Sequence, residues 1–157
     1  MPQQQSVAAA AGECKAPAIG PKQEYLPNVT VITHENRRAL FYDDLLRGKT
    51  VLINFMSVRQ DAELQVTRNL ARVQVLLGER LGRDVFMYSI TTDPEHDAPR
   101  VLKQFAEQHG ARAGWFFLTG DPASIGMLHA RLFASSSGHH GSELAEDCSL
   151  GLVRYGN

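Results

Sequence analysis

The sequence contains very little cysteine. Only Cys14 and Cys148 occur in 157 residues, and they lie near opposite ends of the chain. Neither belongs to a CxxC or CxxxC motif, and their spacing alone leaves open whether they pair with each other. No cysteine or histidine occurs between Thr50 and Asp93. Thiol and imidazole chemistry is therefore excluded in that central stretch.

The sequence also lacks an excess of either charge and any long apolar run. With 16 basic and 17 acidic residues the formal net charge is -1, so charge gives no reason to expect nucleic acid or an anionic membrane as a partner. No apolar run approaches the roughly 18 residues that a membrane span needs, so no span is predicted. The opening MPQQQSVAAAAGEC does not combine a basic region with a long apolar core and is not an intact secretory signal.

The apolar content is sufficient for one globular domain, because 157 residues at 43% hydrophobic can bury a single core. Residues 1–24 are rich in Gln, Ala, Gly and Pro, and they are predicted to form a disordered tail in which Cys14 has no structural role. The folded domain is then predicted to span residues 25–157.

Hydrophobic periodicity and turn residues predict the order of the elements. The expected strands are short apolar or alternating runs at residues 29–33, 39–41, 51–55, 85–90, 115–119 and 150–155. The expected helices have apolar positions at helical spacing and occupy residues 42–47, 61–81, 98–110 and 124–133. The first two strands form an N-terminal β-hairpin. The alternation of strands and helices after it predicts an α/β fold with a mostly parallel central sheet flanked by helices.

One junction in this order suits functional chemistry. The strand 51–55 runs into the long helix within the segment KTVLINFMSVRQDAEL. Free N–H groups and the positive dipole end at a helix start lower the pKa of a thiol, so a redox or metal-binding cysteine pair suits this position. The junction instead offers Ser57, Arg59, Gln60 and Asp61.

Four separated segments carry a resemblance to a known family. They are YLPNVTVITHENRRALFYDDLLRGKTVLINF, SITTDPEHDAPRVLKQFAEQHG, GWFFLTGDP and SLGLVRYGN. In this order and at these distances, the chain resembles the SCO/SenC family of thioredoxin-fold proteins over residues 25–157. The resemblance implies a thioredoxin-like fold for the domain.

The resemblance also implies a site and a function. Members carry a CxxxC motif after the VLINF strand and a distant histidine in a DHS-like segment, which together bind one copper ion. Aligned to that pattern, this chain has Gln60 and Leu64 at the cysteine positions and Cys148 at the histidine position. Members are periplasmic or mitochondrial, and they help assemble the dinuclear copper site of cytochrome c oxidase or act as thiol oxidoreductases.

The resemblance bears on the end of the chain as well. Members usually continue past the VRYGN strand with another strand and a terminal helix. Either the full product is longer than this chain, or the domain lacks that C-terminal helix and ends with an exposed sheet edge.

Donor chemistry argues against the family's copper site in this chain. Cu(I) favours thiolate and imidazole, whereas Gln60 offers a hard, neutral oxygen and Leu64 offers nothing. Disulfide exchange is excluded there too, because it needs two sulfur atoms. No cofactor is therefore predicted, and copper is implied by the resemblance alone. Cys148 is the one weak metal candidate, but Asp147 beside it tends to raise the thiol pKa, and a small half-buried side chain is the simpler interpretation.

The other candidate ligands have simpler explanations. His139 and His140 lie in a Ser/Gly/His loop without a fixed third ligand, so we expect a solvated loop. Met56 and Met87 are predicted to pack in the core. The positions expected at the surface or in caps are His34, His96, His109, His129, Asp93, Arg59 and Asp61.

Two functions from different classes follow. In the first, a degenerate SCO/SenC-like protein without the family's copper site acts by contact with a respiratory oxidase subunit or a copper-handling protein. The resemblance places it in the periplasm or tethered on the periplasmic side of a membrane. In the second, a peroxiredoxin-like or oxidoreductase protein uses Cys148. The first is favoured, because EDCSLG supplies acids rather than the base or cation that activates a thiol. Whether the missing cysteines were lost naturally or by engineering stays open.

Overall fold

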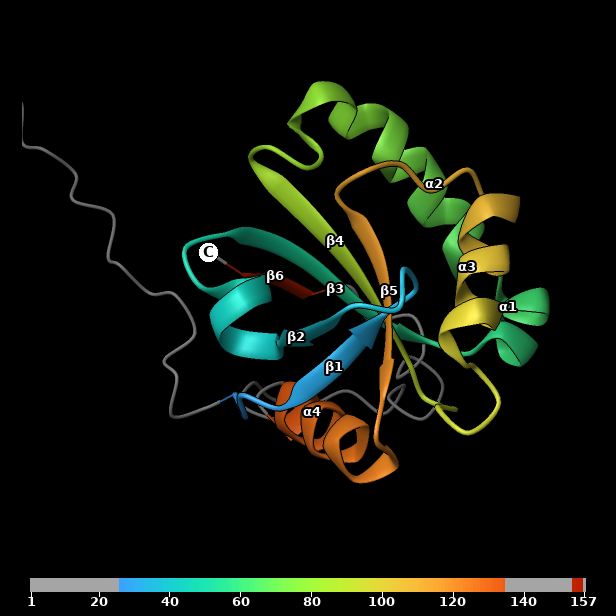
Figure 1. Cartoon of the computed structure of the whole chain (residues 1–157). Coiled ribbons are helices and arrows are strands. Elements are labelled where there is room, and N and C mark those ends of the chain that lie inside the picture. The colour runs from blue at the N-terminus through green and yellow to red at the C-terminus, as the bar shows by residue number, and fades with distance from the viewer. Residues whose placement is uncertain (1–25, 135–153, 157) are drawn as a thin grey trace, which may run out of the picture.

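A six-stranded mixed β-sheet forms the centre of the protein (Figure 1). The computed structural model describes residues 26–134 and 154–156. The strands are β1 (Thr30–Thr33), β2 (Arg38–Leu40), β3 (Thr50–Met56), β4 (Val85–Thr91), β5 (Trp115–Gly120) and β6 (Arg154–Gly156). They lie in the order β2-β1-β5-β4-β3-β6. The three central strands β5, β4 and β3 run parallel, whereas β1, β2 and β6 pair antiparallel with their neighbours.

Helices cover both faces of the sheet (Figure 1). The helical elements are α1 (Val58–Leu64), α2 (Val66–Leu77), α3 (Pro99–Gln108), α4 (Pro122–Ala134), the short π-helix η1 (Phe41–Leu46) and a 3-10 turn (Gly78–Arg80). Helices α1, α2 and α3 bury one core cluster with Met87 and Phe117, and η1 and α4 bury a second with Ile53 and Phe55. The predicted α/β fold with an N-terminal hairpin and flanking helices is confirmed.

The central pair of strands explains where chemistry can be placed. β3 and β4 pair in register from Thr50 with Val85 to Met56 with Thr91. Both faces of these strands are covered, which is why their sequences are almost continuously apolar. The carboxyl ends of parallel strands meet at one edge of the sheet, and ligands of such sheets bind outside that edge. Helix α1, the loop before α3, and helix α4 all begin there.

The prediction of one long helix over residues 61–81 is wrong in one respect, because the structure has two helices there. Gln65 separates α1 from α2 in the left-handed conformation, with φ 53°. The side chain of Asp61 caps the second helix: its Oδ1 accepts hydrogen bonds from Thr67 N at 2.9 Å and Thr67 Oγ1 at 2.8 Å. Apolar periodicity does not detect this break. Leu64, one of the apolar positions of that periodic pattern, is 46% exposed.

The other predicted boundaries agree closely, and the first five strands end within one residue of their predicted limits. The sixth is described only as Arg154–Gly156, which pairs with β3. Several predictions lie outside the described residues: the disordered tail 1–24, and the candidates Cys14, His139, His140 and Cys148. Within the described part, no helix is both long enough and apolar enough to cross a membrane.

Candidate functional site

The junction between β3 and α1 is closed by its own hydrogen bonds. Ser57 is buried and caps α1, because its Oγ accepts a hydrogen bond from the backbone N–H of Gln60 at 3.2 Å. The Ser57 hydroxyl lies 3.2 Å from Gln60 Oε1, to which it donates. Such a cap satisfies one of the N–H groups that a helix start leaves unpaired. The side-chain amide of Gln60 is thus held close to Ser57, at the start of α1.

Gln60 and Leu64 have the spacing of a two-ligand site without its chemistry. They are four residues apart in α1, so they share one face of the helix. Both side chains are exposed. An amide and a hydrocarbon on this face provide no sulfur, so the face can neither exchange disulfides nor bind a soft metal through thiolates.

The space beneath the junction is poor in donors for a copper ion. A cavity of about 10 Å³ is lined by Met56, Ser57, Gln60, Asp61, Leu64 and Val66. Its single soft donor is the thioether of Met56, which is buried. Across residues 26–134 and 154–156, no three His, Cys, Asp or Glu side chains gather closely enough to hold a metal. The described residues therefore do not fit Cu(I) at this junction.

Asp97 ties the first turn of α1 to the neighbouring strand. It is 4% exposed, and its Oδ2 accepts hydrogen bonds from Val58 N at 3.1 Å and from Thr91 Oγ1 at 2.6 Å. Thr91 Oγ1 accepts in turn from Asp93 N at 2.9 Å. The role of Asp97 was not predicted, because nothing local in the sequence indicates a hydrogen bond to a residue 39 positions earlier. An aspartate between a turn and a helix start was the one available signal.

Asp61 is buried rather than solvated, which corrects the prediction for that residue. Its Oδ1 receives both hydrogen bonds from Thr67, and its Oδ2 lies 4.0 Å from His109 Nε2. The His109 ring donates from Nδ1 to Phe105 O at 3.0 Å, which fixes it at the end of α3. Arg59, two residues before Asp61, is exposed as predicted. Asp61 thus joins α1, α2 and α3 instead of facing a partner.

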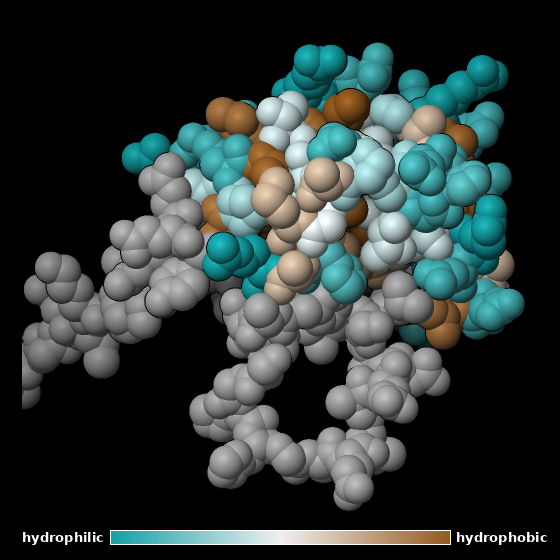
Figure 2. Space-filling view, turned by 90° about the horizontal axis from the view of Figure 1, so that it is seen from below, coloured by the Kyte–Doolittle hydropathy of each residue, from teal (hydrophilic) through white to brown (hydrophobic). Residues whose placement is uncertain are grey.

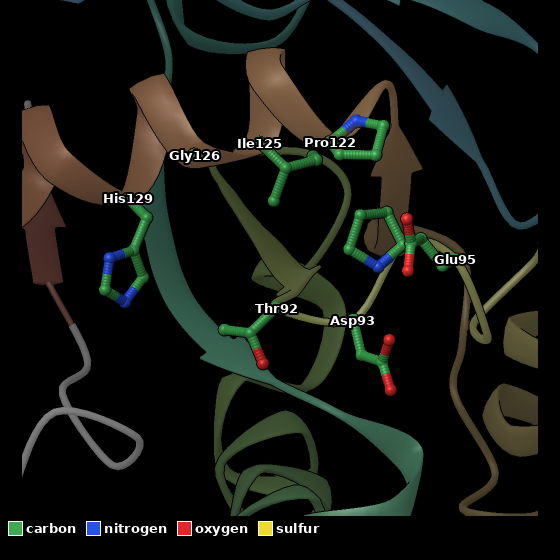
Figure 3. Close-up of a pocket in the computed structure, with 8 residues that line it drawn as sticks. Thr92, Asp93, Glu95, Pro122, Ile125, Gly126 and His129 are labelled. Atoms are coloured by element: carbon green, nitrogen blue, oxygen red, sulfur yellow. The ribbon is translucent and has the colours of Figure 1, made fainter.

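A larger cavity lies beside the junction at the same edge of the sheet. It has a volume of about 380 Å³ and is lined by Thr92, Asp93, Pro94, Glu95, Pro122, Ile125, Gly126 and His129. Figure 3 shows the loop that follows β4 on one side of it and α4 on the other. Asp93 was expected at the surface or in a cap. Its side chain bonds to the His96 ring, with Oδ1 and Nδ1 2.7 Å apart. No lysine or arginine is among the described residues that line this cavity.

His129 contributes a neutral imidazole to that cavity. Its ring packs edge-to-face on Phe55, with centroids 4.9 Å apart. Burial lowers the pKa of His129 from its ordinary value of 6.5, so the ring carries no charge at neutral pH. The lining is therefore acidic, with two carboxylates and no compensating cation among the described residues.

The other residues considered as possible ligands pack in the core or form local hydrogen bonds. Met56 and Met87 are both buried in the core, as predicted. His34 Nδ1 accepts a hydrogen bond from Phe117 N at 3.2 Å. His34, His96, His109 and His129 lie on different elements and do not converge on one ligand. Figure 2 shows the side on which α4 lies, where hydrophobic residues form separate patches among hydrophilic ones.

Comparison with known proteins connects this geometry to a family. The family model described as SCO1/SenC matches residues 31–147. No curated protein matches the chain.

Solved structures give the same assignment. A SCO1/SenC family lipoprotein from Bacillus anthracis is 25% identical, with 83% of this chain and 73% of that chain covered and a TM-score of 0.60. BsSco, described as a member of the Sco family of cytochrome c oxidase assembly proteins, is 25% identical with a TM-score of 0.57, covering 68% of this chain and 62% of that chain. ScoI from Arabidopsis thaliana with copper bound is 22% identical with a TM-score of 0.53, and 65% of this chain is covered.

The chain spans 63% of the length of the Arabidopsis protein. The likeness confirms the predicted thioredoxin-like fold. With most of the domain covered by the family model, from the β1–β2 hairpin past α4, the protein belongs to the SCO1/SenC family.

Proposed function

We propose that this protein takes part in copper handling and cytochrome c oxidase assembly through contacts with other proteins, without holding copper in the family's manner. Family membership supports the first half of the proposal. BsSco is described as belonging to a family of cytochrome c oxidase assembly proteins, and ScoI from Arabidopsis thaliana was solved with copper bound. Copper is the cargo of that process.

The observation that carries the second half is the exposed face of α1. Gln60 and Leu64 occupy it at the spacing of a ligand pair, and neither donates a sulfur or an imidazole. The side chains of Ser57 and Asp61 at the junction are used in hydrogen bonds within the protein. A protein with this junction keeps the family's frame, and its contribution has to come from its surface.

We infer the partner and the compartment from family membership as well. The partner is a respiratory oxidase subunit or a copper-handling protein. The compartment is the periplasm or its membrane surface, and similarity to a Bacillus anthracis lipoprotein of the family supports tethering.

Deletion and complementation test the role in assembly. In native cells that lack the gene, we expect less active cytochrome c oxidase, measured as oxidase turnover per haem. The unaltered chain and Cys148→Ala are both expected to restore it, because the proposal gives the thiol no role. Unchanged oxidase activity after deletion contradicts the assembly role, and restoration by the unaltered chain alone contradicts the thiol-independent part.

Alkylation separates this proposal from the alternative, a thiol-based redox protein that uses Cys148. We expect a maleimide or iodoacetamide probe to modify Cys148 no faster than free cysteine at neutral pH, since reactivity follows the thiolate fraction. Markedly faster modification favours the redox alternative.

A further inference from the structure

We propose that the surface on both sides of the β1–β2 turn binds an extended acidic segment of a partner protein. This surface is called the turn surface below. It is separate from the α1 junction, and the inference does not depend on the function proposed above.

Two grooves make up the turn surface. The first, of about 470 Å³, lies between the turn, η1 and the loop before β5, and includes Arg37, Arg38 and Arg112. The second, of about 390 Å³, lies between the turn and the first turns of α3, and includes Arg100 and Lys103. His34 and Glu35 line both grooves. An extended peptide that passes over the turn can therefore occupy both.

The turn surface is positively charged in a chain that is slightly negative overall. Its grooves are lined by five basic side chains and two acidic ones, Glu35 and Asp44, an excess of three positive charges. The formal net charge of the whole chain is -1. The excess is local, and complementary charge at a contact surface favours encounter with an oppositely charged partner.

Among the residues that the structure describes, most of these basic groups have no ion-pair partner. The Arg37 guanidinium lies 3.9 Å from Glu35 Oε2 in an exposed pair. Within the described part of the chain, Arg38, Arg100, Lys103 and Arg112 make no ion pair, and all four are exposed. Arginine forms two parallel hydrogen bonds with a carboxylate, so these groups are suited to aspartate and glutamate side chains.

The loop that carries Arg112 is held in place before any ligand binds. The buried side chain of Gln74 accepts from Arg112 N at 2.7 Å and donates to Gly110 O at 2.9 Å. Gly114, with φ 99°, packs so closely that a Cβ atom there would lie 2.4 Å from Gly82 N. Little conformational freedom remains to be lost on binding, which favours affinity.

The turn itself is equally well fixed. Thr33 N donates to Arg37 O at 2.8 Å, and His34 N donates to Phe117 O at 2.8 Å. Because His34 Nδ1 accepts from Phe117 N, the neutral ring carries its proton on Nε2. Burial lowers the pKa of His34 below its ordinary value of 6.5. The ring between the two grooves is thus a neutral donor rather than a cation.

The shape and lining favour a peptide over other polyanions. Ala39, Leu45 and Phe116 add apolar surface to the first groove, which suits the side chains of a polypeptide. Glu35 and Asp44 interrupt the basic residues, which suits a polypeptide whose carboxylates can be spaced apart better than a phosphate backbone whose charge is continuous. The occupant is therefore an extended chain that carries carboxylates and occasional apolar side chains.

Fluorescence anisotropy of the full chain tests the proposal. The probe is a fluorescein-labelled peptide of alternating glutamate and leucine, compared with its lysine counterpart. The test variant combines Arg112→Glu with Lys103→Glu, one change in each groove. The control combines Arg68→Glu with Arg72→Glu, which changes the net charge equally on the exposed side of α2. Circular dichroism verifies that both variants are folded.

We expect the glutamate peptide to bind the unaltered protein, and the groove variant to bind it about tenfold more weakly, since two favourable charge contacts become repulsive. The control should differ from the unaltered protein by less than about twofold. Absence of binding, or equal weakening in both variants, overturns the proposal. Tighter binding of a single-stranded oligonucleotide or of phosphatidylglycerol vesicles than of the peptide overturns the choice of occupant.

Discussion

The α1 junction and the turn surface differ in whether their polar groups are buried and hydrogen-bonded or exposed. At the junction, Ser57, Asp61 and Asp97 are buried and bonded to neighbouring elements. On the turn surface, Arg38 and Arg112 are exposed and make no ion pair within the described residues. Buried polar groups must find partners, and once bonded they have little capacity left for a ligand. Exposed cations without an ion pair can still bind a ligand.

The junction keeps its geometry whatever residues stand at positions 60 and 64. The strand-to-helix geometry at the junction depends on apolar packing and backbone pairing, which do not require a cysteine. The junction therefore serves structure, and the free charges lie elsewhere.

The largest effect is expected from placing thiols at positions 60 and 64. Gln60→Cys combined with Leu64→Cys places two thiols on one face of α1, so we expect Cu(I) affinity to rise by about a thousandfold. Competition with a chromophoric chelator measures it, and Gln60→Ser with Leu64→Ser is the matched control. No gain in affinity would mean that the junction does not hold two thiols in a geometry that binds Cu(I).

A large loss of stability is expected when Asp97 is removed. Asp97→Ala leaves Val58 N and Thr91 Oγ1 without their buried acceptor, which should lower the free energy of unfolding by about 3 kcal/mol. Urea unfolding measures this loss. Glu95→Ala, an exposed acid in the same loop, should change stability by less than about 0.5 kcal/mol. Equal effects in the two variants would show that Asp97 does not hold the junction.

A smaller loss is expected at Asp61. Asp61→Ala removes the cap of α2 and leaves Thr67 N unpaired, so we expect a loss of about 2 kcal/mol. The control is Glu63→Ala, on the exposed side of the same helix. A loss at Asp61 no greater than at Glu63 would return Asp61 to the solvated role that sequence analysis gave it.

The smallest effect is a pH dependence that comes from His34 on the turn surface and from His129 in the cavity beside the junction. Burial lowers the pKa of His34 and of His129 from 6.5. As pH falls below this value the unfolded chain binds protons first, so stability is complete above about pH 6.5 and declines as pH falls through the folded pKa. His129→Gln should reduce that decline by less than about 1 kcal/mol, because its ring is partly exposed.

Chemical unfolding at about pH 7.5 and pH 5.5 measures the decline. The control is His96→Gln, because His96 is exposed. A decline that His129→Gln leaves unchanged would show that His129 is not buried in the way described.

The sequence predicts the sheet well because its evidence is local. Continuous apolar runs such as 51–55 and 85–90 specify buried parallel strands, and the structure has them as β3 and β4. The break at Gln65 was not predicted, since it depends on the carboxylate of Asp61 reaching Thr67. The role of Asp97 was missed for the same reason. Such hydrogen bonds depend on which elements become neighbours, and residue type alone does not show that.

The most direct test of the account is a Cu(I) titration of the full, unaltered chain against a competing chromophoric chelator, beside Cys148→Ala. The account predicts that neither protein takes copper from the chelator, because Gln60 and Leu64 provide no soft donor. Tight one-to-one binding that is lost in Cys148→Ala would contradict it, and would show that a copper site has been rebuilt around that thiol.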